Sequence, residues 1–289
     1  MPVSYGLAPV GCRPSTGASG QRAGTVALAT AYPYLTTGWR RLGRLLAMNL
    51  ILRTAAASDR GKTRENNEDA LYAGPHVVAV ADGVGGGPSG EVASALVIRT
   101  LAALESAFPR QATAALQAAV AEANQRVRAA IDHDPSLEGM ATTLTAMVVT
   151  EDGLAIGHIG DSRAYAWRGR TLTQLTRDDT YVQGLVDNGV ISPEEARRHP
   201  QRSLVTQAIN GSEIAPTYAV VTPLPGDRFL LCSDGLSDYV DDQQIADALA
   251  QYPDLERCAR RLIDLALDAG APDNVSVVVA DVVADPSDG

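Results

Sequence analysis

Four aspartates of this sequence, Asp82, Asp161, Asp234 and Asp273, stand where apolar, strand-like segments end or begin, beside a glycine or a polar turn. A fifth, Asp69, closes a polar stretch. A single Asp-Gly pair after a strand is most often a turn. Several such strand ends at one sheet edge would place carboxylates close enough to repel one another unless cations or protons neutralise them. The spacing therefore predicts a cation-binding carboxylate cluster.

Hard divalent cations, Mg²⁺ or Mn²⁺, prefer oxygen ligands of this kind. The histidines share no spacing, and Cys12, Cys232 and Cys258 are too scattered for a zinc site. Two ions can activate a shared water and neutralise phosphoryl oxygens, which suits hydrolysis of phosphate monoesters. Arg64, five residues before Asp69, is the candidate phosphate ligand, because a planar guanidinium binds two oxygens. The alternative is an ordinary surface arginine.

Strands and helices must position these side chains. Apolar runs predict strands at 50–56, 76–81, 142–150, 154–159, 164–168, 172–175, 218–221, 228–232 and 275–283. Helical spacing predicts helices at 89–107, 111–131, 242–250 and 255–269. The strands within 142–175 should form one antiparallel meander, and 178–200 should carry short helices in a surface insertion, the flap. This order predicts an α+β layered sandwich.

The composition narrows the class of protein. The chain has 289 residues, 45% of them hydrophobic and 20% charged, which suits one large catalytic domain. A formal charge of -10 argues against a nucleic-acid partner. No apolar run reaches the roughly 18 residues of a membrane-spanning helix. Three scattered cysteines fit a reducing cytoplasm.

Residues 1–47 differ from the rest of the chain. No Asp or Glu occurs before Asp59, whereas five arginines fall within 1–47. We predict that 1–47 is a disordered, arginine-rich extension, that Met48 is the natural start, and that 48–289 is the catalytic domain. The alternative is a twin-arginine or secretory signal at Arg40-Arg41, but Arg53 interrupts the apolar stretch that follows.

Six motifs occur in one order between Leu50 and Val283, at 58–69, 81–86, 139–144, 157–163, 231–236 and 273–276. Together they resemble the metal-dependent protein phosphatases, the type 2C serine/threonine phosphatases, and particularly the bacterial members. The resemblance implies a four-layer α-β-β-α sandwich, in which two mostly antiparallel sheets are flanked by helix pairs and the metals lie at one end.

The resemblance also implies roles for individual residues. Asp82 would bridge two Mn²⁺ or Mg²⁺ ions, and Gly83 would offer its backbone carbonyl to one of them. Asp234 and Asp273 would ligate the other ion. A third ion would lie near Asp161 and share Asp234.

Two further roles and two departures concern the rim of this centre. Asp69 would support the ions through bound waters, and Arg64 would hold the phosphate. Many eukaryotic relatives have a histidine, proposed as the general acid, where this chain has Val84, so a metal-bound water would protonate the leaving group. The family's Asp-His-Ser is replaced by Asp178-Asp179-Thr180, which leaves the shape of the flap and the substrate preference open.

These observations predict a monomeric, cytoplasmic phosphatase of signal transduction that acts on phosphoserine and phosphothreonine. Its partners would be phosphoproteins, including serine/threonine kinases, and neither nucleic acid nor membrane. One alternative is a catalytically weak regulatory module that binds phosphoproteins, although the intact Asp82, Asp234, Asp273 and Arg64 argue against it. Another is a phosphatase dedicated to a single transcription regulator.

Overall fold

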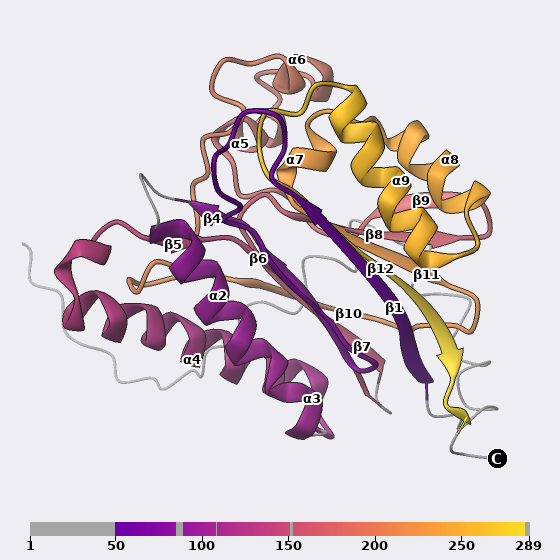
Figure 1. Cartoon of the computed structure of the whole chain (residues 1–289), viewed down its shortest axis with the longest axis horizontal. Helices are drawn as coiled ribbons and strands as arrows, with labels where there is room; N and C mark the ends of the chain where they lie inside the picture. The colour runs from indigo at the N-terminus through magenta and orange to yellow at the C-terminus, as the bar shows by residue number, and fades with distance from the viewer. Residues whose placement is uncertain (1–49, 85–88, 108, 151–152, 287–289) are drawn as a thin grey trace, which may run out of the picture.

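The computed structural model describes residues 50–84, 89–107, 109–150 and 153–286. It shows the predicted α+β sandwich of four layers, with two sheets inside and helices on both outer faces (Figure 1). The extension at 1–47 and the proposed start at Met48 lie outside the described residues, as do Gly85 and Gly86 of the second motif. No helix of the described part is long and apolar enough to cross a membrane.

Two five-stranded antiparallel sheets form the inner layers of the described chain. The first has the order β1 (Leu50–Asp59), β12 (Val275–Ala284), β11 (Arg228–Cys232), β8 (Arg163–Arg168) and β9 (Thr171–Gln174). The second has the order β10 (Thr217–Val221), β7 (Gly153–Ile159), β6 (Leu144–Thr150), β3 (Val77–Ala81) and β2 (Ala70–Ala73). A short ribbon pairs β4 (Gly83–Val84) with β5 (Ala141–Thr142).

The helices cover the outer face of each sheet (Figure 1). The second sheet carries α2 (Ser89–Ala102) and α4 (Ala112–His133), with the short α3 (Leu104–Ala107) and the 3-10 turn η2 (Pro135–Leu137) beside them. The first sheet carries α8 (Asp242–Gln251) and α9 (Leu255–Asp268), preceded by α7 (Asp234–Ser237). Helix α9 buries one apolar stripe at a spacing of three to four residues, as an amphipathic helix should.

The strand β3 shows why the central strands are continuous apolar runs rather than alternating ones. Its five residues are all fully buried. Val77, Ala79 and Ala81 pack against the helices, whereas Val78 and Val80 pack against the other sheet. Both faces of the strand therefore exclude water, which removes the polar positions that mark a half-buried strand.

The predicted single meander over 142–175 is wrong. β6 and β7 pair in the second sheet, whereas β8 and β9 pair in the first. The chain crosses between the sheets at 160–162, where Gly160 has a φ of +104° and a Cβ would lie 2.7 Å from the Thr143 side chain. Only glycine fits this turn without strain. The crossing places Asp161 between the two sheets.

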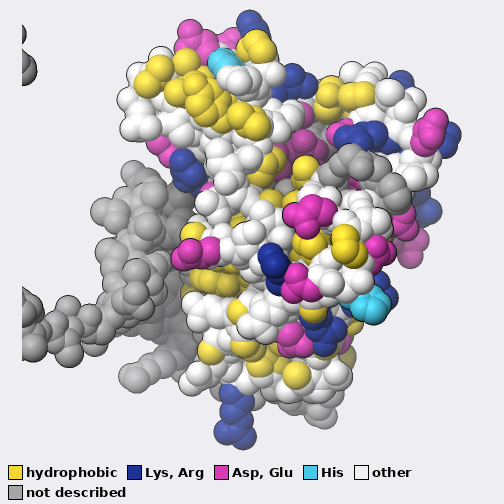
Figure 2. All heavy atoms as spheres, turned by 90° about the vertical axis from the view of Figure 1, so that its left-hand side faces the viewer, with side chains coloured by type: hydrophobic (Ala, Val, Ile, Leu, Met, Phe, Trp, Pro, Cys, Tyr) yellow, Lys and Arg dark blue, Asp and Glu magenta, His cyan; other side chains and the backbone are white. Residues whose placement is uncertain are grey.

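The flap contains the two short helices that were predicted for 178–200, α5 (Tyr181–Asp187) and α6 (Pro193–Arg197). A bridge between Thr180 and Val205 joins the two ends of this insertion, so the flap extends to 206. Exposed large apolar side chains of the flap include Tyr181, Val190 and Leu204. Figure 2 shows apolar side chains gathered on the lobe at the top of the molecule.

Candidate metal centre

The five predicted aspartates come together at one end of the sheets. Asp69 precedes β2, Asp82 follows β3, Asp161 lies on the crossing after β7, Asp234 begins α7 after β11, and Asp273 precedes β12. Burial raises the pKa of Asp82 well above its ordinary value, and the charges of the other four aspartates raise it further. The repulsion that the sequence predicted therefore exists in the folded chain.

Asp234 and Asp69 also have raised pKa values. Burial raises the pKa of Asp234 well above its ordinary value, and the charges of Asp161 and Asp238 add to it. Burial also raises the pKa of Asp69 to about 6. A positive charge at this place would relieve the cost of keeping these groups ionised.

Two buried carboxylate oxygens show that the cluster fits a cation. Among the described residues, Asp69 Oδ1 and Asp234 Oδ1 are buried without a hydrogen-bond partner. The other oxygen of Asp69 accepts from Ser233 Oγ at 2.8 Å. An unpartnered buried carboxylate oxygen is costly, and a hard cation would satisfy it. In the described ranges, no three His, Cys, Asp or Glu side chains are arranged so that they alone could hold a metal ion. A cation here would therefore need water among its ligands, as is usual for Mg²⁺.

Backbone contacts fix Asp82 and its glycine. The Asp82 amide donates to Thr143 Oγ1 at 3.0 Å, and its carbonyl accepts from the Thr143 amide at 2.9 Å. Gly83 is buried, and a Cβ there would lie 2.5 Å from the backbone of Gly90 in the first turn of α2. Close packing therefore requires glycine at position 83. The metal-binding role of the Gly83 carbonyl stays a prediction.

Two further polar residues, which sequence reasoning left without a role, hold the cluster together. Asn274 is buried, and its side chain accepts from the Glu68 amide at 2.8 Å while donating to the carbonyls of Arg60 and Asn66. Ser233 donates to Asp69 and accepts from the Ser276 amide at 2.9 Å. Their signal was a polar side chain adjoining a buried strand.

Arg64 borders the cluster. Its Nε and one terminal nitrogen lie 2.8 and 2.9 Å from the two carboxylate oxygens of Asp273. Half of the side chain (49%) is exposed, so a ligand from solution can reach it. The hydrogen bond to Asp273 and the negative charges nearby raise the pKa of the guanidinium, which keeps it charged. The phosphate-binding role of Arg64 stays a prediction.

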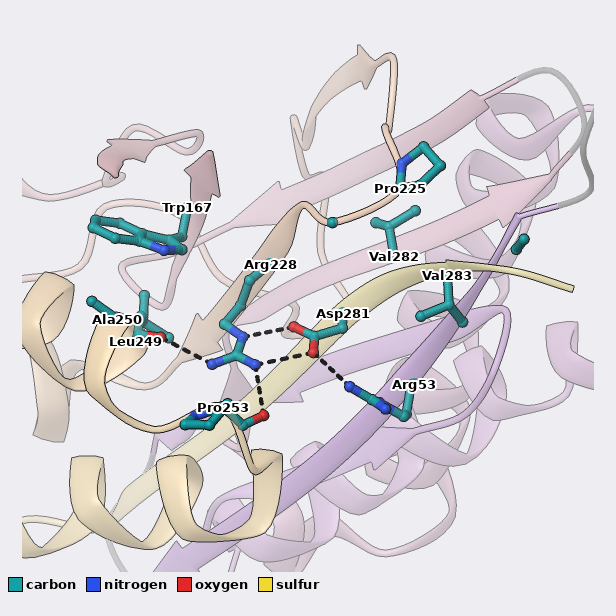
Figure 3. Close-up of a pocket in the computed structure, with 12 residues that line it drawn as sticks. Arg53, Trp167, Pro225, Arg228, Leu249, Ala250, Pro253, Asp281, Val282 and Val283 are labelled. Atoms are coloured by element: carbon teal, nitrogen blue, oxygen red, sulfur yellow. Dashed lines mark hydrogen bonds and ion pairs between the residues drawn. The ribbon is translucent and has the colours of Figure 1, made fainter. Parts of the chain in front are cut away.

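A cavity of about 550 Å³ lies at the other end of the strands (Figure 3). The buried Arg228 in its wall bonds both oxygens of Asp281 and the carbonyls of Leu249 and Pro253. Asp281 also accepts from Arg53 at 3.0 Å. These charged groups satisfy one another, so the arrangement ties the α8–α9 connection to the sheet.

Two further ionisable side chains, His158 and Cys232, are buried. His158 is 3% exposed, and its ring bonds Thr145 Oγ1 and the Arg177 carbonyl, both at 2.9 Å. Burial raises the pKa of Cys232 to about 12, which leaves its thiol protonated and unreactive. Neither residue contributes a ligand to the cluster.

The chain matches a known protein family. The family model described as protein phosphatase 2C matches residues 60–273. The chain belongs to the protein phosphatase 2C family. The identification that the six motifs indicated is therefore confirmed, and the four-layer fold is that of solved phosphatases of this family.

Relatives in this phosphatase family include bacterial enzymes. The serine/threonine protein phosphatase PstP of Mycobacterium tuberculosis (strain H37Rv) is 54% identical over 237 residues, which are 82% of this chain and 46% of PstP. The chain thus spans about half the length of that relative. The serine/threonine phosphatase stp of Listeria welshimeri is 32% identical over 235 residues, 78% of this chain and 93% of stp.

Solved structures of phosphatases in this family have a similar fold. The crystal structure of M. tuberculosis PstP/Ppp has a TM-score of 0.78 at 54% identity and covers 80% of this chain and 98% of that one. The catalytic domain of PstP in complex with two manganese ions has a TM-score of 0.77 at 52% identity, covering 81% and 99%.

The pH dependence of stability provides a first test of this phosphatase-family cluster. Burial raises the pKa of Asp161 from 3.8 to about 7, and the charges of Asp178 and Asp238 contribute. The proton is held more tightly in the folded state, so the stability that Asp161 contributes is complete below pH 3.8 and is lost as the pH rises through about 7. The loss is up to about 4 kcal/mol.

We therefore expect the melting temperature of the chelator-treated wild type to fall from pH 5 to pH 8 relative to that of Asp161→Asn. Thermal denaturation of the two proteins across this range measures the difference. Parallel curves would show that Asp161 does not titrate in the cluster as described.

Proposed function

We propose that the chain hydrolyses phosphoserine and phosphothreonine in proteins, using two Mn²⁺ or Mg²⁺ ions held by the aspartate cluster. The observation that carries the proposal is the convergence of four aspartates around Asp82, with two buried carboxylate oxygens unpartnered among the described residues and a guanidinium at the rim. The named activities of the relatives and the two manganese ions of PstP support it.

Each site residue has a role in this proposal. Asp82 would hold both ions, Asp234 and Asp273 would hold one of them, and the Gly83 carbonyl and Asp69 would complete the site. When bound, the ions supply an activated water and neutralise charge on the phosphoryl oxygens.

Two residues at the rim complete the roles. Arg64 would bind and orient the substrate phosphate, and Asp161 together with Asp234 would hold a third ion. Val84, at 41% exposure, presents an apolar side chain where a general acid would stand. The leaving seryl or threonyl oxygen therefore takes its proton from water.

The proposal also includes the substrates of the chain and its place of action. The substrates are phosphoproteins, with serine/threonine kinases among them, and the chain acts in cytoplasmic signal transduction as a monomer. The catalytic domain is 48–289, preceded by an extension at 1–47.

Metal removal tests the proposal. Phosphate release from a phosphothreonine peptide should require Mn²⁺ or Mg²⁺ and should stop when excess chelator is added, because the cluster has no other means of activating water. Adding Mn²⁺ back should restore the initial rate. A malachite-green assay of released phosphate measures each step.

Two outcomes would contradict the proposal of a metal-dependent phosphatase. If the folded protein binds Mn²⁺ and the phosphopeptide but hydrolyses neither the peptide nor a small aryl phosphate, it is a phosphoprotein-binding module. Turnover that continues in chelator would exclude the metal mechanism.

A further inference from the structure

The stem of the flap is a small ladder of hydrogen bonds. The Tyr181 amide donates to the Leu204 carbonyl at 2.9 Å, and the Thr206 amide donates to the Asp179 carbonyl at 2.7 Å. Thr206 Oγ1 donates to the same carbonyl at 2.9 Å. The residues that leave the core and those that return to it are thereby joined in a paired stem. Farther out, Arg202 of the flap also pairs with Asp238 of the core, and Arg197 pairs with Asp242.

Asp179 fastens this stem to the turn before Asp161. Its amide donates to the Gly160 carbonyl at 2.7 Å, and its side-chain Oδ2 accepts from the Gly160 amide at 3.0 Å. One residue of the stem thus bonds both backbone groups of the glycine at which the chain crosses between the sheets. A second anchor lies beside it, where His158 Nε2 meets the Arg177 carbonyl at 2.9 Å.

The contacts continue from this turn to the centre of the cluster. Ser162 Oγ and Thr143 Oγ1 are 2.8 Å apart, and Thr143 bonds the backbone of Asp82 on both sides. Asp161 lies between Gly160 and Ser162. Hydrogen bonds and the peptide links of 160–162 therefore connect the flap stem to the backbone that carries Asp161 and Asp82.

A cavity of about 250 Å³ between the flap and α7 has Asp161 in its lining, with Val182 and Gln183 from the flap and Ser237 from the core. Ser237 Oγ is buried and has no hydrogen-bond partner within the described chain. The position of the flap thus sets the space around Asp161.

Position 179 is also where this chain departs from the family's Asp-His-Ser pattern. The aspartate adds a negative charge here, and that charge acts against the fall in the pKa of His158 that burial causes. Its side chain is 17% exposed, so most of it is withdrawn from water. The charge and the side-chain bond to the Gly160 amide come from the aspartate, whereas any residue except proline could donate the backbone bond to the Gly160 carbonyl.

We propose that Asp179 is a positioning residue that couples the flap to the Asp161 turn and thereby tunes the affinity of the cluster for a divalent cation. This rests on the proposed function only in taking the cluster as a cation site. Because coupling between two sites is reciprocal, a protein substrate that shifts the flap changes cation affinity, and the cation changes affinity for that substrate.

Direct Mn²⁺ titration by calorimetry tests the coupling. Asp179→Ala, which removes the side-chain acceptor, should weaken the affected Mn²⁺ binding step by about 10-fold or more, the loss typical of a mutated second-layer group. Asp179→Asn keeps an oxygen toward Gly160 and should stay within about 3-fold of wild type, because it loses the charge and not the bond. Asp187→Ala removes another flap aspartate, paired with Arg177, and should bind Mn²⁺ as wild type does.

Wild-type Mn²⁺ affinity in Asp179→Ala would overturn the proposal. If that variant does not fold, Asp179→Glu takes its place, since it keeps the charge but displaces the carboxylate, and unchanged Mn²⁺ binding in it is equally decisive. The titration needs no turnover. A wild type that binds Mn²⁺ but hydrolyses nothing therefore refutes the phosphatase proposal without affecting this comparison.

Discussion

Asp82→Asn should lower kcat by more than about 100-fold, because mutation of outer residues around a metal already costs about 10- to 100-fold and Asp82 is placed at the centre. The asparagine has nearly the same shape, so Thr143 can still hold its backbone. What it lacks is the charge that the other four aspartates surround. Initial rates on a phosphothreonine peptide in saturating Mn²⁺ measure the effect.

The same substitution should not weaken the metal-free fold. Burial and neighbouring carboxylates raise the pKa of Asp82, so ionising it at neutral pH costs stability in the chelated protein, and the neutral asparagine avoids that cost. In chelator at pH 7.5, the melting temperature of Asp82→Asn should equal or exceed that of the wild type. With Mn²⁺ added, the wild type should gain more.

Asp132→Asn provides the matched control. Asp132 is an exposed partner of Arg128 on α4, outside the cluster, and its loss should leave both the rate and the Mn²⁺-induced stabilisation unchanged. An Asp82→Asn protein that retains more than a tenth of the wild-type kcat would remove Asp82 from the centre of the mechanism.

Arg64→Ala should reduce kcat/KM by about 100-fold, the equivalent of about 2.7 kcal/mol, because charge-assisted hydrogen bonds contribute about 1.5–3 kcal/mol each. Arg64→Lys keeps the charge but loses the fork, and it should recover only part of the loss. Steady-state kinetics on an aryl phosphate and on a phosphopeptide measure both variants.

Arg60 lies in the same loop, and its backbone carbonyl accepts from Asn274. Arg60→Ala keeps that carbonyl and should retain wild-type kinetics. Equal losses in Arg60→Ala and Arg64→Ala would mean that the loop contributes only general positive charge, which would contradict a specific phosphate contact at Arg64.

Much of the architecture could be predicted from local patterns. An apolar stripe predicts the helix α9, and an unbroken apolar run predicts the strand β3. Four of the aspartates were recognisable because each adjoins an apolar strand, whereas Asp69 closes a polar stretch. The pairing partners of the strands could not be predicted, since β7 and β8 follow each other closely in the chain and nothing local distinguishes the sheet to which each belongs.

The roles of Asn274 and Asp179 could not be predicted from the sequence, for a different reason. Asn274 acts through backbone groups of Arg60, Asn66 and Glu68, which are more than 200 positions away in the chain. Asp179 likewise acts on Gly160 through a contact that only the crossing creates. Such roles depend on which loops meet, and the periodicity of a segment carries no information about that.

The pairing of β1 with β12 has a consequence for the order in which a newly made chain becomes functional. Ser58 and Ser276 face each other at 2.7 Å although they stand 218 positions apart. A ribosome therefore completes β10, the last strand of the second sheet, well before it makes β12, which lies between β1 and β11. Contacts this distant form slowly. Because Asp273 and Asn274 immediately precede β12, the nascent protein gains its complete centre only in the final stage of assembly.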